Sequence, residues 1–80
     1  MVVTIEDIQV LVGLQLGKRK VSASDRLMED LGAESADIVN IIATVEDKYQ
    51  ISLEEADISR LRTVRDIYNF IKTPTAYGTN

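Results

Sequence analysis

Ser35 is the residue whose type and position most strongly suggest a chemical role in this sequence. The 80 residues include no histidine and no cysteine, so an imidazole base, a thiolate nucleophile and a zinc–sulfur site are excluded. Ser35 begins the best helical pattern in the chain, soon after Gly32. Its hydroxyl could cap that helix, which is the ordinary role of serine at a helix start. Alternatively it could carry a phosphate-linked group, because a helix N-terminus offers unpaired N–H donors and a positive dipole.

Some carboxylates of the chain occur as adjacent pairs that do not form an acid–base site. Three such pairs lie at residues 29–30, 46–47 and 54–55. Neighbouring residues on a helix point about 100° apart, so two adjacent carboxylates cannot converge on one substrate atom. The sequence also lacks the ligand spacing of a calcium loop and any glycine-rich phosphate loop. We interpret the pairs as solvated surface charge.

The charge balance argues against nucleic acid as a partner. Lys and Arg number 9 and Asp and Glu 13, which gives a formal net charge of −4. The short basic run at residues 18–20 lacks interleaved aromatics and is predicted to be solvated charge. No apolar run approaches the ~20 residues of a membrane helix, and the N-terminus does not resemble a signal peptide. We expect a cytoplasmic monomer that inserts into no membrane.

The element expected before Ser35 is a helix from Thr4 to Leu16. Thr4 is a good N-cap, and Asp7 occupies the reciprocal position of a capping box. Gly17 is a natural stop for this helix. The apolar positions expected to form its buried face are Ile5, Ile8, Val10, Leu11, Val12, Leu14 and Leu16.

The helix that begins at Ser35 is expected to run to about Tyr49. Its apolar stripe consists of Ile38, Ile41, Ile42, Val45 and Tyr49. The preceding stretch, Lys18 to Glu34, shows no sustained period. Long loops without secondary structure are usually functional or disordered. The apolar residues spaced along this one favour an ordered loop pinned to the core; they are Val21, Leu27, Met28 and Leu31.

Two shorter helices are predicted after Tyr49. Ser52 with Glu55 reads as a capping box that begins a short helix ending near Ile58. Thr63 provides another cap signal, and the helix that follows it continues to Lys72.

These elements predict an all-α fold, a small antiparallel bundle of three main helices plus one short helix. Amphipathic helices of this length can share one core within a single small domain. We expect that domain to occupy residues 1–72 and to be followed by a flexible C-terminal tail over residues 73–80.

The string around Ser35 resembles the acyl carrier protein family. Residues 25–39 contain an acidic, apolar lead-in, then Leu-Gly, then Glu-Ser-Ala and an acidic apolar helix; residues 45–51 and 63–71 resemble the family's later helices. The resemblance covers residues 4–72. It implies that Ser35 carries 4′-phosphopantetheine, attached from coenzyme A by a phosphopantetheinyl transferase. The protein would then bear acyl groups as thioesters and deliver them to fatty-acid, polyketide or related biosynthetic enzymes, without being an enzyme itself.

The resemblance also suggests which residues meet partners and cargo. Glu34 and Ala36 depart from the Asp and Leu usual in the family, which leaves the pathway open. The stretch at residues 56–62 is also longer and more basic than in the commonest fatty-acid carriers, and together these departures favour a specialised carrier. The expected docking residues for basic patches on partner enzymes are Glu34, Ala36, Asp37, Asn40, Glu46 and Asp47. The residues expected to line an acyl cleft between the second and third helices, with ordinary core packing as the alternative, are Ile38, Ile42, Val45, Ile51, Ala56 and Leu61.

Two alternatives remain open at this point. The chain could be an acidic helical interaction module that lacks a prosthetic group, or its cargo could be an aminoacyl, D-alanyl or peptidyl group. Arg60, Arg62 and Arg65 could contact a specific partner, or they could simply balance the acidic residues at 54–57. The sequence points to no metal site.

Overall fold

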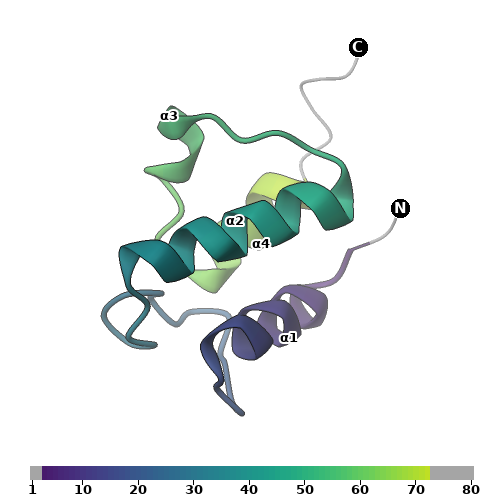
Figure 1. Ribbon diagram of the computed structural model, residues 1–80. Coiled ribbons are helices and arrows are strands. Elements are labelled where there is room, and N and C mark those ends of the chain that lie inside the picture. The colour runs from purple at the N-terminus through teal and green to yellow at the C-terminus, as the bar shows by residue number, and fades with distance from the viewer. Residues whose placement is uncertain (1–2, 73–80) are drawn as a thin grey trace.

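The computed structural model describes residues 3–72, which fold into four helices (Figure 1). In chain order these are α1 (Ile5–Leu16), α2 (Ser35–Tyr49), α3 (Glu55–Ile58) and α4 (Val64–Lys72). The predicted all-α fold with three main helices and one short helix is confirmed. The predicted tail, residues 73–80, lies outside the described residues.

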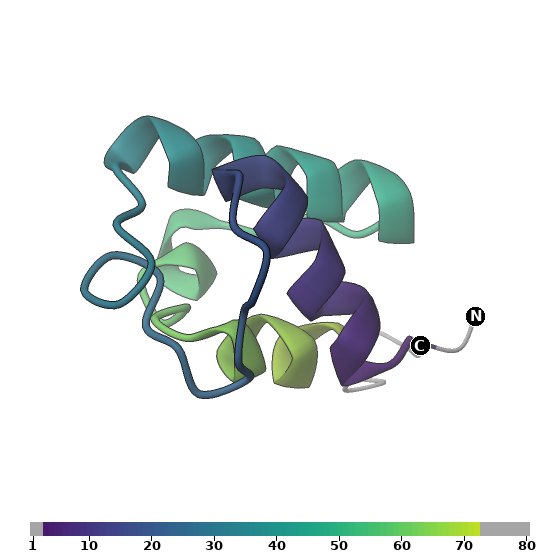
Figure 2. The same ribbon diagram turned by 90° about the horizontal axis from the view of Figure 1, so that it is seen from below.

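The three main helices pack with α1 at the centre of their contacts. α1 packs against both α2 and α4, and Figure 2 shows it crossing between them. The short α3 lies on the opposite side of α2 from α1 (Figure 1). The surface formed by α2 and α3 is therefore separate from the outer surface of α1.

The ends of α1 and α4 follow the predicted cap signals. The Thr4 N–H donates to Asp7 Oδ2 at 3.0 Å, and the Asp7 N–H donates to Thr4 Oγ1 at 3.1 Å. The same reciprocal pair joins Thr63 and Asp66 at the start of α4, at 3.0 and 3.1 Å. Gly17 ends α1 with a φ of 68°, a left-handed conformation that glycine adopts without steric cost.

The start predicted for the third helix was wrong. α3 begins at Glu55, with Glu54 as its N-cap, so Ser52 and Glu55 do not form a capping box. The Glu54 N–H instead donates to Asp57 Oδ2 at 3.1 Å. Leu53 explains the shift, because its side chain packs against the core and its N–H is already bonded to Glu46. These contacts hold residues 51–53 out of the helix.

The core is drawn from the three main helices, from the loop between α1 and α2, and from the segment between α3 and α4. Its buried side chains are Ile8, Leu11, Val12, Leu27, Leu31, Ala33, Ile41, Ile42, Val45, Leu61, Val64 and Ile67. Val10 and Leu14, predicted to widen the buried face of α1, are instead 60% and 79% exposed. α1 meets its neighbours through Ile8, Leu11 and Val12, so the opposite side of the helix faces solvent.

The long loop before α2 is ordered, as its spaced apolar residues predicted. Leu27 and Leu31 are buried and anchor it in the core. Its backbone is also joined to the segment before α4 and to the first turn of α4: the Leu27 N–H donates to the Arg62 carbonyl at 2.8 Å, and the Arg65 N–H donates to the Ala23 carbonyl at 2.8 Å. These bonds hold residues 23–27 of the loop beside residues 62–65.

Candidate functional site

Ser35 is the first residue of α2, and its side chain is exposed. It is not the helix cap, which corrects the ordinary interpretation of a serine at this position. Glu34 is the N-cap residue, and the Glu34 N–H donates to Asp37 Oδ2 at 2.9 Å. No hydrogen bond joins the Ser35 hydroxyl to another residue within 3–72. The oxygen is therefore accessible from solvent and available for covalent attachment.

The backbone around Ser35 suits an anionic substituent. Within the described part of the chain, the N–H groups of Ser35 and Ala36 make no hydrogen bond. They lie at the start of a helix of 15 residues, where the aligned peptide dipoles leave partial positive charge. A phosphodiester on the Ser35 oxygen would lie close to these donors.

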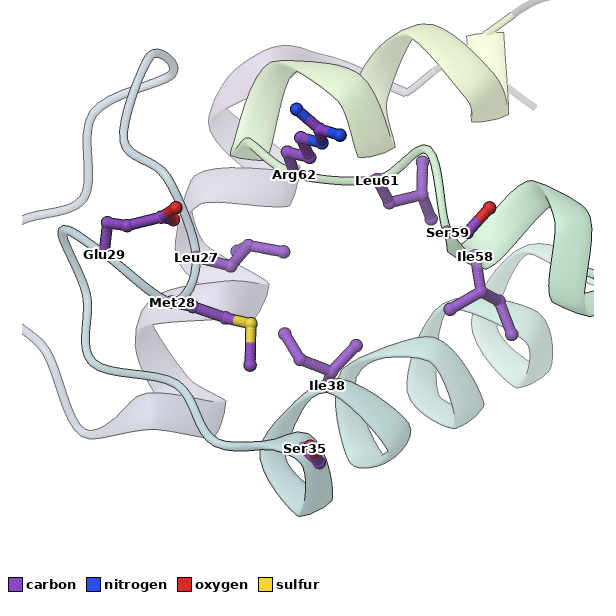
Figure 3. Close-up of a pocket in the computed structure, with 9 residues that line it drawn as sticks. All are labelled: Leu27, Met28, Glu29, Ser35, Ile38, Ile58, Ser59, Leu61 and Arg62. Atoms are coloured by element: carbon purple, nitrogen blue, oxygen red, sulfur yellow. The ribbon is translucent and has the colours of Figure 1, made fainter.

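An apolar groove of about 400 Å³ opens beside Ser35. Three segments form it: the loop at 27–29, the first turn of α2, and the end of α3 with the residues that follow it up to residue 62. Figure 3 shows Leu27, Met28, Ile38 and Leu61 directed into this space, with Ser35 at its edge. The remaining residues that line the groove are Glu29, Ile58, Ser59 and Arg62. Covalent cargo on Ser35 would therefore have an apolar surface within reach.

This groove coincides only in part with the acyl cleft expected from the sequence. Ile38 and Leu61 line it as expected. Ile42 and Val45 are buried in the core, where they pack with the other main helices. Ile51 is half-buried against that core, while Ala56 is exposed on α3; neither lines the groove.

Sequence reasoning missed Leu27, Met28 and Ile58 as groove residues. Leu27 and Met28 come from the loop, which the backbone bonds to residues 62–65 hold against the start of α2. Met28 was expected to help pin the loop to the core, but it is 53% exposed. The available signal was that Leu27 and Met28 are adjacent apolar residues within this loop. The position of this pair opposite Ile58 depends on contacts between residues that are far apart in the sequence.

The expected docking residues divide into two groups. Glu34, Ala36, Asn40 and Asp47 are exposed along α2 and free to face a partner. Asp37 and Glu46 are half-buried and accept backbone hydrogen bonds, Asp37 from Glu34 and Glu46 from Leu53 at 2.8 Å. These two carboxylates therefore contribute to the local fold as well as to the negative surface.

The loop in front of Ser35 contains an exposed ion pair. Arg26 Nε lies 3.1 Å from Asp30 Oδ2, and Arg26 Nη2 lies 3.2 Å from Oδ1. The side-chain hydrogen bond from Arg26 lowers the pKa of the Asp30 carboxyl, and a backbone hydrogen bond from the same residue lowers that pKa further. The same side-chain bond raises the pKa of Arg26. The pair closes the turn that leads to Gly32 and Ser35.

Comparison with known proteins agrees with the family resemblance of the sequence over most of the chain. A family described as phosphopantetheine attachment site matches residues 6–71. An acyl carrier protein of Chlamydia felis is 36% identical over 70 residues, which cover 85% of this chain and 90% of that protein. One from Exiguobacterium is 35% identical over 69 residues, covering 84% and 87%. The chain belongs to the acyl carrier protein family.

Similarity in three dimensions supports the acyl carrier protein fold. A solved structure from Mycobacterium tuberculosis, described as a candidate acyl carrier protein, superposes with a TM-score of 0.76 at 29% identity. The match covers 81% of this chain and 89% of that one. Membership of the family makes the protein a carrier with a phosphopantetheine attachment site, not an enzyme. No helix within residues 3–72 is long and apolar enough to cross a membrane.

Proposed function

We propose that Ser35 is the attachment residue for 4′-phosphopantetheine and that the protein delivers acyl groups to biosynthetic enzymes. The observation that carries this assignment is the exposed Ser35 hydroxyl, without a hydrogen-bond partner in residues 3–72, at the start of α2 and at the edge of an apolar groove. When attached, the arm supplies a thiol that holds an acyl group as a thioester. The chain itself supplies the anchoring oxygen, the positive helix start and the groove.

The groove supports a second part of the proposal, that cargo is partly withdrawn from water beside Ser35. Leu27, Ile38 and Leu61 offer apolar side chains to an acyl chain. Burying methylene groups against such a surface is favourable by roughly 0.8 kcal/mol each. Because Ile42 and Val45 lie in the core, a long acyl chain would reach them only if the helices separated.

We propose that partner enzymes approach the end of the molecule that presents Ser35. These partners are a phosphopantetheinyl transferase and acyl-processing enzymes with basic patches. Glu34, next to Ser35, is an exposed carboxylate that such patches could attract, and exposed Asp47, in the last turn of α2, adds to that attraction over long range. Exposed charges of this kind accelerate encounter and are screened by salt, which suits a carrier that must also dissociate quickly. The proposed location is the cytoplasm, and the proposed working state is a monomer.

Intact-mass measurement after enzymatic loading tests the attachment site. The protein is incubated with coenzyme A and a broad-range phosphopantetheinyl transferase. We expect one phosphopantetheinyl unit on the native sequence and none on Ser35→Ala. Ser59→Ala is the matched control, because Ser59 lines the same groove but its hydroxyl already donates to the Ala56 carbonyl at 2.9 Å. An increment retained in Ser35→Ala would refute the assignment, and no increment with several transferases would favour an interaction module without the arm.

The pathway is tested separately, on protein isolated from its native cells. Fatty-acid, polyketide or related acyl groups on Ser35 would support the proposal. An aminoacyl, D-alanyl or peptidyl group there would replace the proposed cargo while leaving the attachment site intact.

A further inference from the structure

The outer surface of α1 carries a second groove that the proposed function does not use. It has a volume of about 680 Å³ and lies between α1 and the segment at residues 18–22. No residue that lines it also lines the groove beside Ser35. α1 and α3 lie on opposite sides of α2 (Figure 1), so the two grooves belong to different parts of the surface.

Close backbone packing forms the wall of this α1 groove. The Lys18 N–H donates to the Gly13 carbonyl at 2.9 Å, and the Gln9 side-chain amide donates to the Val21 carbonyl. Gly13 permits this approach: a methyl group there would lie 2.9 Å from the Lys18 carbonyl oxygen and 3.4 Å from Val21 Cγ2. The segment is therefore fixed against α1, and the groove exists before any partner binds.

The α1 groove combines exposed apolar and unpaired basic side chains. Val10 and Leu14, both largely exposed, provide apolar surface along α1. Lys18, Arg19 and Lys20 also line the groove, and none of them forms an ion pair within residues 3–72. Glu6 is the acidic residue among those that line it. The local charge is thus positive on a chain whose formal net charge is −4.

We propose that the α1 groove is a second docking surface, which binds an acidic amphipathic helix of a partner protein. Apolar side chains of that helix would contact Val10 and Leu14, and its carboxylates would pair with the three cations. The hollow shape favours a helix over a flat lipid surface, since a recess accommodates protruding side chains. A partner bound there would leave Ser35 open, so the carrier could be held on one protein while its cargo is presented to another.

The proposal is tested with a synthetic helical peptide that has leucine on one face and glutamate on the other. Backbone amide shifts of the purified protein are followed by NMR as the peptide is added. We expect shifts at residues 9–22 and none at 58–62, with binding that weakens as salt is added. A peptide with glutamine in place of glutamate should bind clearly less well.

Two matched triple variants distinguish the effect of charge at the α1 groove from the effect of the net charge of the protein. Lys18→Glu, Arg19→Glu and Lys20→Glu together should weaken peptide binding by about tenfold or more. Arg60→Glu, Arg62→Glu and Arg65→Glu together change the net charge equally and should leave binding at residues 9–22 in place. Loss of binding in both triples alike would overturn the proposal, as would peptide-induced shifts confined to the groove beside Ser35.

Other occupants give distinct results in the same set of measurements. If vesicles of phosphatidylglycerol bind the native sequence but not the 18–20 triple, while the peptide does not bind, the surface is a lipid site and the proposal is wrong. Concentration-dependent sedimentation that the same triple abolishes would assign the surface to a second copy of the chain. Enzymatic loading of Ser35, measured by intact mass, should be equal in the native chain and the 18–20 triple. The test of attachment at Ser35 and the test of docking at the α1 groove can therefore fail separately.

Discussion

The carboxylates on and beside α2 have different roles, although the sequence does not distinguish them. Asp37 accepts the Glu34 N–H and Glu46 accepts the Leu53 N–H, whereas Glu34 and Asp47 are exposed. A carboxylate that binds a backbone N–H satisfies a donor that helix geometry leaves unpaired. If mutation of Asp37 or Glu46 weakened partner binding, the loss could come either from a missing docking contact or from a destabilised fold. Glu34 and Asp47 are the cleaner probes of docking.

Asp37→Ala should destabilise the fold by about 1 kcal/mol, because it removes the carboxylate that accepts the Glu34 N–H at the start of α2. Urea unfolding followed by circular dichroism measures this change. Asn40→Ala, at an exposed position on the same helix, is the control and should change stability little. Equal stability of Asp37→Ala and the native sequence would contradict the capping role.

Arg26→Gln should lower stability at neutral pH and leave it unchanged in strong acid. Folding lowers the pKa of Asp30 below its ordinary value of 3.8 through hydrogen bonds from Arg26. The stabilisation is thus present above that ordinary value and is lost as pH falls through the lower folded-state pKa. Because the pair is exposed, the effect should be small and should shrink with added salt.

Urea midpoints of the native chain and Arg26→Gln, measured from neutral to acidic pH, provide the check. The two curves should converge at low pH. A difference that persists after Asp30 is protonated would show that Arg26 stabilises the loop through packing and not through its charge.

At the scale of elements, the segments between helices position the groove. The loop before α2 is held by backbone hydrogen bonds to residues 62–65, and residues 51–53 are held out of α3 by contacts of Leu53. The carboxylate of Glu46, near the end of α2, therefore holds the chain that leads to α3 against that helix.

Glu46→Ala should destabilise the protein by about 1–2 kcal/mol, because the partly buried Leu53 N–H loses a charged acceptor. Asp47→Ala is the neighbouring control and should have a much smaller effect, since Asp47 is exposed. Urea unfolding gives the stability of both variants. Amide hydrogen exchange at residues 51–53 should accelerate in Glu46→Ala and not in Asp47→Ala. Unchanged exchange in Glu46→Ala would show that the bond from the Leu53 N–H to Glu46 does not hold this segment.

At the scale of the whole molecule, the groove beside Ser35 and the α1 groove border one small core at separate places. The core is closed by the three main helices and by Leu27 and Leu31 of the loop. The groove beside Ser35 lies over one edge of this core, and the α1 groove lies on the outer face of α1. A chain of 80 residues buries a limited core, so cargo that adds apolar contacts should change its overall stability measurably.

Acyl loading should raise the melting temperature, and longer acyl chains should raise it more, because each methylene buried in the groove contributes roughly 0.8 kcal/mol. For a domain of this size, 1 kcal/mol corresponds to a shift of about 4–8 °C. Differential scanning calorimetry of the unacylated and acylated forms measures the shift. Ile58→Ser, in the groove wall, should reduce it, and Val39→Ser, at an exposed site outside the groove, should not. An equal melting temperature across chain lengths would argue against burial of the cargo.

The sequence by itself determined the helices whose signals are local. The caps at Thr4 and Thr63, the stop at Gly17 and the apolar period of α2 all act within a few residues, so they could be predicted directly. The hypothesis that Ser35 is the attachment residue also rests on its neighbours in the sequence, because the motif around it is contiguous. Local interactions of this kind are largely independent of the rest of the fold.

Tertiary structure decided what depends on residues far apart in the chain. Leu53 kept Ser52 from capping α3, and the pairing of residues 23–27 with 62–65 brought Leu27 and Met28 into the groove beside Ser35. The exposure of Val10 and Leu14 was likewise set by which side of α1 meets α2 and α4. Apolar periodicity marks the residues that could be buried, but only packing of the elements selects those that are.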